Sequence, residues 1–238
     1  MTLTHQERMQ VLRTRAVTWA GIVATGVLFL VAMSWFPGEG DGRGKGYSFG
    51  GHFLSAMGRT RAGSFDNTVS CFIFNGTLIM VGTLLMAFWK SRALFFTRPA
   101  AATVLRHCGL AMGLAMAGIG LTPYNFFPHV HNLMTYAVIL FGVVCFGLCF
   151  FGSWREFESM KSKLTWLAIL MVAGAAQAVF WHLTSMGRIP SRPVLPLMQK
   201  LFVLLLALWA GWQGFLFGRA CRTEPASLKT EDNGCVQA

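Results

Sequence analysis

The chain has 238 residues, of which 54% are hydrophobic and 12% are charged. Soluble domains carry about 25% charged residues, so this composition excludes a soluble domain or a disordered chain and places most of the protein in lipid. The net charge of +11 does not indicate nucleic-acid binding, because the basic residues flank apolar runs, as in membrane proteins, and form no stripe with interleaved aromatic residues.

Six apolar segments are long enough to cross a membrane, since a spanning helix needs about 20 mostly apolar residues. The stretch 107–154 contains no Asp, Glu, Lys or Arg and is too long for one helix, so the turn signals Pro123, Asn125 and Pro128 divide it. The first segment follows three arginines and also resembles a signal peptide, but its length favours a retained helix. The expected spans are 16–36, 67–89, 101–121, 129–153, 164–184 and 193–218.

We therefore expect an all-α, polytopic membrane protein whose six transmembrane helices form one bundle. Thirteen basic residues fall in the segments on one side of the membrane and seven on the other, which predicts that both termini are cytoplasmic. The regions are then a cytoplasmic arm over 1–15, a membrane domain over 16–219 and a cytoplasmic tail over 220–238, which is expected to be disordered. The expected location is a cell membrane, either the bacterial inner membrane or a plasma membrane.

Small residues recur at helical spacing in three of the expected spans. Gly109, Gly113 and Ala117 are four residues apart, Gly214 and Gly218 repeat the spacing in the last span, and residues 173–176 form a run of Ala and Gly. Helices in lipid associate by close backbone contact. These residues are therefore interpreted as helix contact faces.

Polar side chains gather in the outer half of the expected bundle, the half opposite the termini. Four spans contribute them at similar depth, Gln177 among them, whereas the inner half has little beyond Gln213. Polar groups are costly inside a membrane, so such a layer indicates a functional site. It predicts an outward-facing pocket, covered by the loop around His52 and Ser55 and lined by Asn75, His131, Asn132, His182, Gln199 and Lys200.

The histidines show the same asymmetry, and they raise the question of a metal site. Three or four imidazoles with a carboxylate can bind zinc and leave a position open for water. The preferred interpretation is a hydrogen-bonded polar cluster or a headgroup pocket, because histidines also suit membrane interfaces and helix caps. No cofactor and no catalytic residue is therefore assigned firmly; the candidate zinc ligands are His52, His129, His131, His182 and Asp66.

The first outer loop is rich in glycine, with seven glycines within residues 37–51. Its residues do not match the spacing of a phosphate-binding loop, so a flexible linker is the simpler interpretation. The stretch 47–61 is expected to fold back over the outer helix ends. There Arg59 and Arg61 would pair with Asp66 or with lipid phosphates.

Four short motifs, taken in order, resemble the DUF998 family of membrane proteins. They are Ser55-Ala56-Met57-Gly58 before the second span, Phe74-Asn75-Gly76 within it, Gly120-Leu121-Thr122-Pro123 with Phe127-Pro128 and His131-Asn132 around the third-to-fourth turn, and Gln199-Lys200-Leu201 opening the last span. The resemblance covers about residues 16–219. The related Frag1/DRAM/Sfk1 proteins share the six-helix layout.

This resemblance implies an architecture more than an activity. The better-known relatives are implicated in lipid-anchor remodelling, phosphoinositide-kinase regulation and autophagy, mostly as membrane factors without a settled reaction. The family usually has an acidic residue after the serine of the first motif, whereas this chain has Ala56. If that acid is a ligand or base in the relatives, this chain lacks it unless Asp66 takes its place.

Three functions are consistent with the sequence, and membrane lipids are the expected partners. The first is a non-enzymatic accessory factor that binds lipid headgroups or a small amphiphile. The second is a zinc-dependent membrane hydrolase of lipid amides or esters, which rests on the outer histidines and is an analogy to other membrane hydrolases. The third is a transporter, which the apolar inner half disfavours. The sequence identifies no protein partner.

Overall fold

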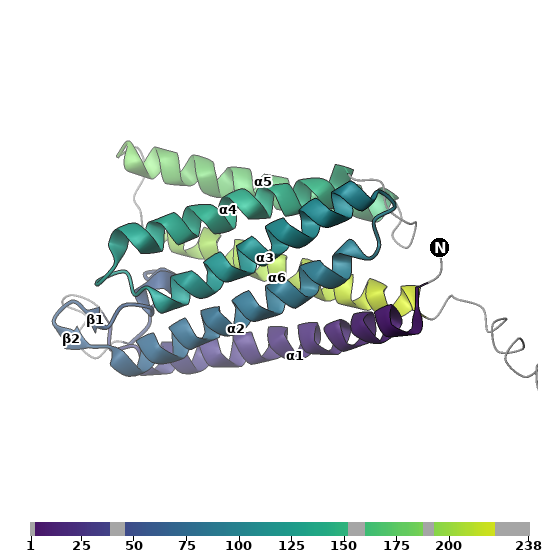
Figure 1. Cartoon of the computed structure of the whole chain (residues 1–238). Coiled ribbons are helices and arrows are strands. Elements are labelled where there is room, and N and C mark those ends of the chain that lie inside the picture. The colour runs from purple at the N-terminus through teal and green to yellow at the C-terminus, as the bar shows by residue number, and fades with distance from the viewer. Residues whose placement is uncertain (1–2, 39–45, 152–159, 188–192, 222–238) are drawn as a thin grey trace, which may run out of the picture.

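The computed structural model describes residues 3–38, 46–151, 160–187 and 193–221. Six long helices form a single bundle, and each runs antiparallel to the helix before it in the chain (Figure 1). Each is long and apolar enough to cross a membrane, which confirms the six expected spans and makes the chain a multi-pass membrane protein. The helices are α1 (His5–Trp35), α2 (Thr68–Ala93), α3 (Pro99–Leu121), α4 (Pro128–Phe151), α5 (Met160–Ser185) and α6 (Val194–Ala220).

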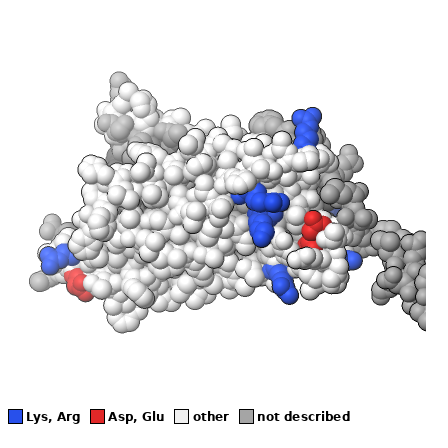
Figure 2. All heavy atoms as spheres, viewed as in Figure 1, with Lys and Arg blue, Asp and Glu red and all other residues white. Residues whose placement is uncertain are grey.

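The two ends of the bundle differ in what they carry. The start of α1 and the end of α6 lie together at one end, here called the terminal end (Figure 1). Residues 46–67 lie at the opposite end, here called the loop end. On the face drawn in Figure 2 the charged side chains lie toward these two ends and leave an uncharged band between them. Such a band is what a protein surrounded by hydrocarbon requires.

The helices do not pack equally well. Helix α2 packs against both α1 and α3, α3 against α4, and α6 against α1 and α5. Contact between α4 and α5 is slight, and the two helices diverge toward the loop end (Figure 1). As a result, α5 is held mainly by α6.

Helix α1 begins earlier than the sequence predicted, at His5. Thr4 and Glu7 form a capping box, in which the Glu7 amide donates to the Thr4 hydroxyl (3.2 Å) and the Thr4 amide donates to the Glu7 carboxylate (2.9 Å). This pair satisfies two of the amides that a helix start leaves unbonded. Most of the arm expected over 1–15 is therefore the first part of α1.

Glycines set the closeness of α2 and α3. A Cβ atom at Gly82 would overlap the Gly113 carbonyl oxygen and crowd Ala117, and one at Gly109 would overlap Trp89. Only glycine lets two backbones approach so closely. The contact face expected on the third span is thus confirmed.

The loop end departs from a purely helical fold. A single 3-10 turn, η1 (Leu54–Ala56), is followed by a small hairpin of β1 (Arg61–Ala62) and β2 (Phe65–Asp66). The two strands are antiparallel with Arg61 opposite Asp66, and Gly63 turns the chain with a φ of +61°. Residues 46–67 are called the loop. The loop buries Leu54 and Met57 in a cluster with Phe36 and Phe74, which fixes it to α1 and α2.

Candidate functional site

The loop is attached to α6 by two neighbouring polar residues. The Lys200 ammonium donates to the His52 carbonyl oxygen (2.6 Å) and to the Pro196 carbonyl oxygen (3.2 Å). The Leu54 amide donates to Oε1 of Gln199 (2.8 Å). Two adjacent residues near the start of α6 thus bind the loop at His52 and at Leu54. The expectation that this stretch folds back over the helix ends is confirmed.

Aromatic rings surround the same ammonium. The Nζ atom of Lys200 lies 5.3 Å from the ring centre of Tyr47 and 5.0 Å from that of Phe49, a distance at which the ring face attracts a cation. The Tyr47 hydroxyl donates to the His52 carbonyl oxygen as well (3.0 Å). Burial raises the pKa of Tyr47, so its hydroxyl keeps the proton that this hydrogen bond needs. Lys200 itself is only 8% exposed.

Helix α2 holds the other half of the loop through Asn75 and Asn67. The Asn75 amide donates to the Gly58 carbonyl oxygen (3.2 Å), and the Asn67 amide donates to the carbonyl oxygens of Met57 (3.2 Å) and Arg59 (2.6 Å). A Cβ at Gly58 would come within 2.9 Å of the Asn75 side chain. Buried amides in this part of α2 therefore bind loop carbonyls and leave no room for a side chain at Gly58.

The turn between α3 and α4 is closed by His131. Its Nδ1 atom lies 2.8 Å from the Thr122 carbonyl oxygen, and its ring packs edge-on against Tyr124, 5.6 Å between centres. The guanidinium of Arg59 lies over the same Tyr124 ring, 5.4 Å from its centre. His131 thus fixes the turn and links it to the loop.

The residues expected to line one pocket fall into two groups. Asn75, His52, Gln199 and Lys200 are joined through the loop, and their polar atoms hold it to the helices. Ser55 lies in η1 and is half-buried. Asn132 and His182 are exposed. The polar layer of the loop end therefore serves first to position the loop.

The candidate zinc ligands either make hydrogen bonds within the protein or are exposed. The His52 ring accepts a hydrogen bond from the Ser48 amide (2.8 Å), and Asp66 accepts one from the Thr68 hydroxyl (2.6 Å). His129 is exposed. Over the described ranges, no three His, Cys, Asp or Glu side chains lie close enough to hold a metal ion.

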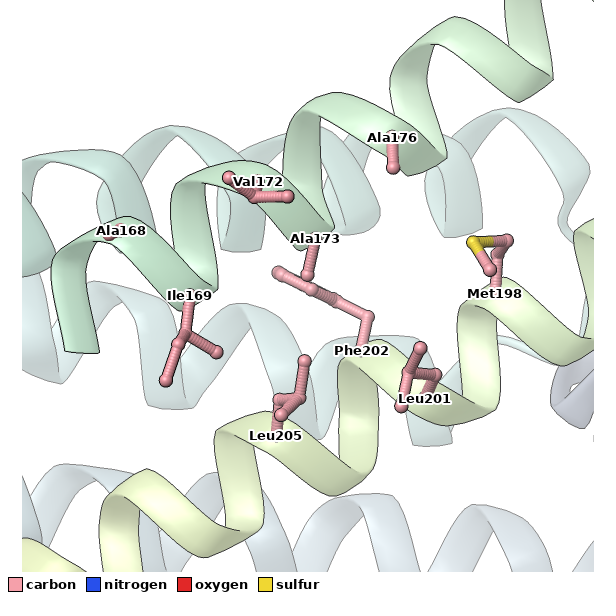
Figure 3. A pocket seen from close by; sticks show the side chains of 9 residues that line it. All are labelled: Ala168, Ile169, Val172, Ala173, Ala176, Met198, Leu201, Phe202 and Leu205. Carbon is pink, nitrogen blue, oxygen red and sulfur yellow. The ribbon is translucent and has the colours of Figure 1, made fainter. Parts of the chain in front are cut away.

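A groove of about 480 Å³ lies between α5 and α6 (Figure 3). Ala176 and Met198 lie toward its loop end, and Ala168 and Leu205 toward its terminal end. The nine side chains that line it are all apolar: Ala168, Ile169, Val172, Ala173, Ala176, Met198, Leu201, Phe202 and Leu205. We did not predict this groove from the sequence. The run of small residues 173–176, which leaves space beside α5, was the only pattern that could have indicated it.

One amide side chain follows the groove toward the loop end. Gln177 comes directly after Ala176 on α5, on the side of the loop end. Gln199 lies on α6 between the lining residues Met198 and Leu201, and its Oε1 atom binds the Leu54 amide. The Oε1 atom of Gln177 is buried and has no hydrogen-bond partner in the described part of the chain. An apolar groove that ends beside an amide can hold an amphiphile, with its chain along the groove and its polar head at the loop end.

Comparisons with protein-family models, with curated proteins and with solved structures give no match to this chain.

Proposed function

We propose that this membrane protein binds a lipid or a similar amphiphile in the groove between α5 and α6 and acts as an accessory factor. The observation that carries the proposal is the wholly apolar groove of about 480 Å³ that ends beside Gln177. Membership of the DUF998 family, proposed from the order of its motifs alone, agrees with a membrane factor of this kind.

The dimensions and the position of the groove suit an acyl chain. Ala168 and Ala176 are eight residues apart, so the wall of α5 extends for about 12 Å. Val172 is 69% exposed beside the groove, which opens the groove sideways to the bilayer. A lipid would enter laterally, without crossing water. Its head would then lie near the loop end.

The loop helps by fixing the wall of the groove. Gln199 and Lys200 bind the loop through Leu54 and His52, and Met198 and Leu201 on either side of that pair line the groove. The polar layer and the groove are therefore adjacent parts of one helix. In this proposal the layer orients α6, and the groove contacts the ligand.

A filling substitution tests the proposal. The protein, reconstituted in nanodiscs, is labelled with a fatty-acyl probe that carries a photoactivatable group in its chain. Ala176→Phe fills the groove and should lower labelling of α5 and α6 about tenfold, the change that corresponds to about 1.4 kcal/mol of binding free energy. Ala175→Phe is the matched control, because Ala175 is exposed outside the groove. Equal labelling of the two variants would contradict the proposal.

A further inference from the structure

We propose that the ligand of this groove is an uncharged amphiphile with a hydroxyl group on its head, an inference that rests on the proposed function. Two buried oxygens of α5 point to it. The Oε1 atom of Gln177 and the Oγ1 atom of Thr184 are buried, and neither has a hydrogen-bond partner among the residues that the structure describes.

These two oxygens continue the line of the groove. Gln177 lies one helical turn beyond Ala173 and next to Ala176, both of which line the groove. Thr184 is seven residues further on, which places it on the same face of α5, about 10 Å nearer the loop end. A head bound beyond the apolar chain would therefore meet first the amide and then the hydroxyl.

The energetics favour a ligand that makes these hydrogen bonds. A polar group buried without a partner destabilises a protein, and in a bilayer no water is at hand to replace the partner. Buried polar groups are therefore almost always bonded, either to another protein group or to an ordered water molecule. A hydroxyl suits the amide in either orientation, because it can donate to Oε1 and accept from the amide nitrogen.

The charges around the groove disfavour an ionic head. All nine lining residues are apolar. Lys200, in the same turns of α6, donates its protons to the carbonyl oxygens of His52 and Pro196. An anionic phosphate in the groove would face the Gln177 oxygen, and none of the described residues that line the groove carries a positive charge to balance it. An uncharged head avoids this repulsion.

Matched amphiphiles test the inference on the full chain in nanodiscs. The probes are a monoacylglycerol with a photoactivatable chain, its analogue with both hydroxyls methylated, and the lysophosphatidic acid of the same chain. The monoacylglycerol should bind about tenfold more tightly than the methylated analogue, as expected for one or two neutral hydrogen bonds. Gln177→Met and Thr184→Val should each reduce that preference. Thr165→Val, on the same helix but bonded to the Lys161 carbonyl oxygen, should keep it.

The outcomes separate this inference from the proposed function. If none of the probes labels the groove, the proposed function fails and this inference fails with it. If wild-type protein binds the hydroxyl and methylated forms equally, or binds the lysophosphatidic acid most tightly, the groove binds amphiphiles but the hydroxyl-bearing head is wrong. Retention of the preference in both Gln177→Met and Thr184→Val would also overturn it.

Discussion

Lys200 is the residue that most clearly links the loop to α6. Its ammonium is buried, and it donates to two backbone carbonyl oxygens while two aromatic rings face it. A buried charge is costly unless hydrogen bonds and nearby electron-rich groups replace its water. One of the two carbonyls belongs to the loop, at His52, and the other to α6 itself, at Pro196. The side chain therefore couples the position of the loop to the first turns of α6.

Replacing this lysine should loosen the loop. Lys200→Met keeps the length of the side chain but removes the donor to His52, and hydrogen bonds to charged groups contribute about 1.5–3 kcal/mol. We expect faster amide hydrogen exchange at Leu54 and Met57, with exchange in α3 unchanged. Lys161→Met is the control, because Lys161 is exposed at the start of α5. Unchanged exchange at Leu54 would show that Tyr47 and Gln199 hold the loop without the lysine.

At the scale of single residues, the sequence could predict at which end of the bundle a polar residue lies, but not which group it binds. The position of Asn75, Gln199 and Lys200 in their spans placed all three at the loop end, and the structure confirms it. The groups that they bind are backbone atoms of His52, Leu54 and Gly58. A backbone amide or carbonyl is present at every residue, so no sequence motif marks it. For this reason the sequence suggested a pocket where the structure shows a docked loop.

Among the elements, α2 and α3 form the closest pair, and glycine is the reason. At Gly82 the Gly113 carbonyl oxygen takes the space of a Cβ, and at Gly120 the Asn75 carbonyl oxygen does the same. Neither oxygen can move without displacing a helix. By contrast, a Cβ at Gly76 on α2 would meet nothing within 4 Å. The same helix thus offers a crowded glycine and an open one.

These two glycines should respond to alanine in opposite directions. Gly82→Ala should lower the stability by about 1–3 kcal/mol, the usual effect of overpacking. Gly76→Ala should leave stability unchanged or raise it by up to about 1 kcal/mol through helix propensity. The measurement is thermal unfolding of the purified variants in the same detergent. Equal melting temperatures would mean that α2 and α3 can separate slightly at little cost.

Small residues also show where prediction from sequence ends at this scale. The spacing of Gly109, Gly113 and Ala117 predicted a contact face, and Gly113 does lie against Gly82. The run over 173–176 supported the same prediction, yet two of its residues line a groove. A small side chain permits close approach only if the facing residue is also small. Opposite this run, Met198 and Phe202 hold the helices apart (Figure 3).

For the molecule as a whole, hydropathy predicted the architecture and left the arrangement of the helices open. The number of spans follows from chain length and apolar runs, both visible in the sequence. Which helices are neighbours depends on side-chain fit. For example, α6 packs on α1 where Trp19 covers Gly211 and Gly214, a contact far apart in sequence. The slight contact between α4 and α5 could not be read from composition either.

The orientation of the bundle is the remaining prediction at this scale. By sequence, the segments expected on the side of the termini hold thirteen basic residues and those on the other side hold seven, so the terminal end should face the cytoplasm. Gln6→Cys and Ser64→Cys place exposed thiols at the terminal end and in the hairpin of the loop end. A membrane-impermeant maleimide added to intact cells should label Ser64→Cys at once, but Gln6→Cys only after the membrane is permeabilised. Wild-type protein controls for the native cysteines.

The result also decides from which leaflet the proposed ligand is drawn. Gln177 lies beyond the groove toward the loop end, so an amphiphile that binds there as proposed has its head in the leaflet that the loop faces. If the maleimide labels Ser64→Cys from outside, that leaflet is the outer one. If it labels Gln6→Cys instead, the distribution of basic residues does not set the orientation, and the same groove draws its ligand from the cytoplasmic leaflet. The proposed binding does not depend on which case holds, because the apolar wall of the groove and Gln177 are fixed by the fold and not by the direction of insertion.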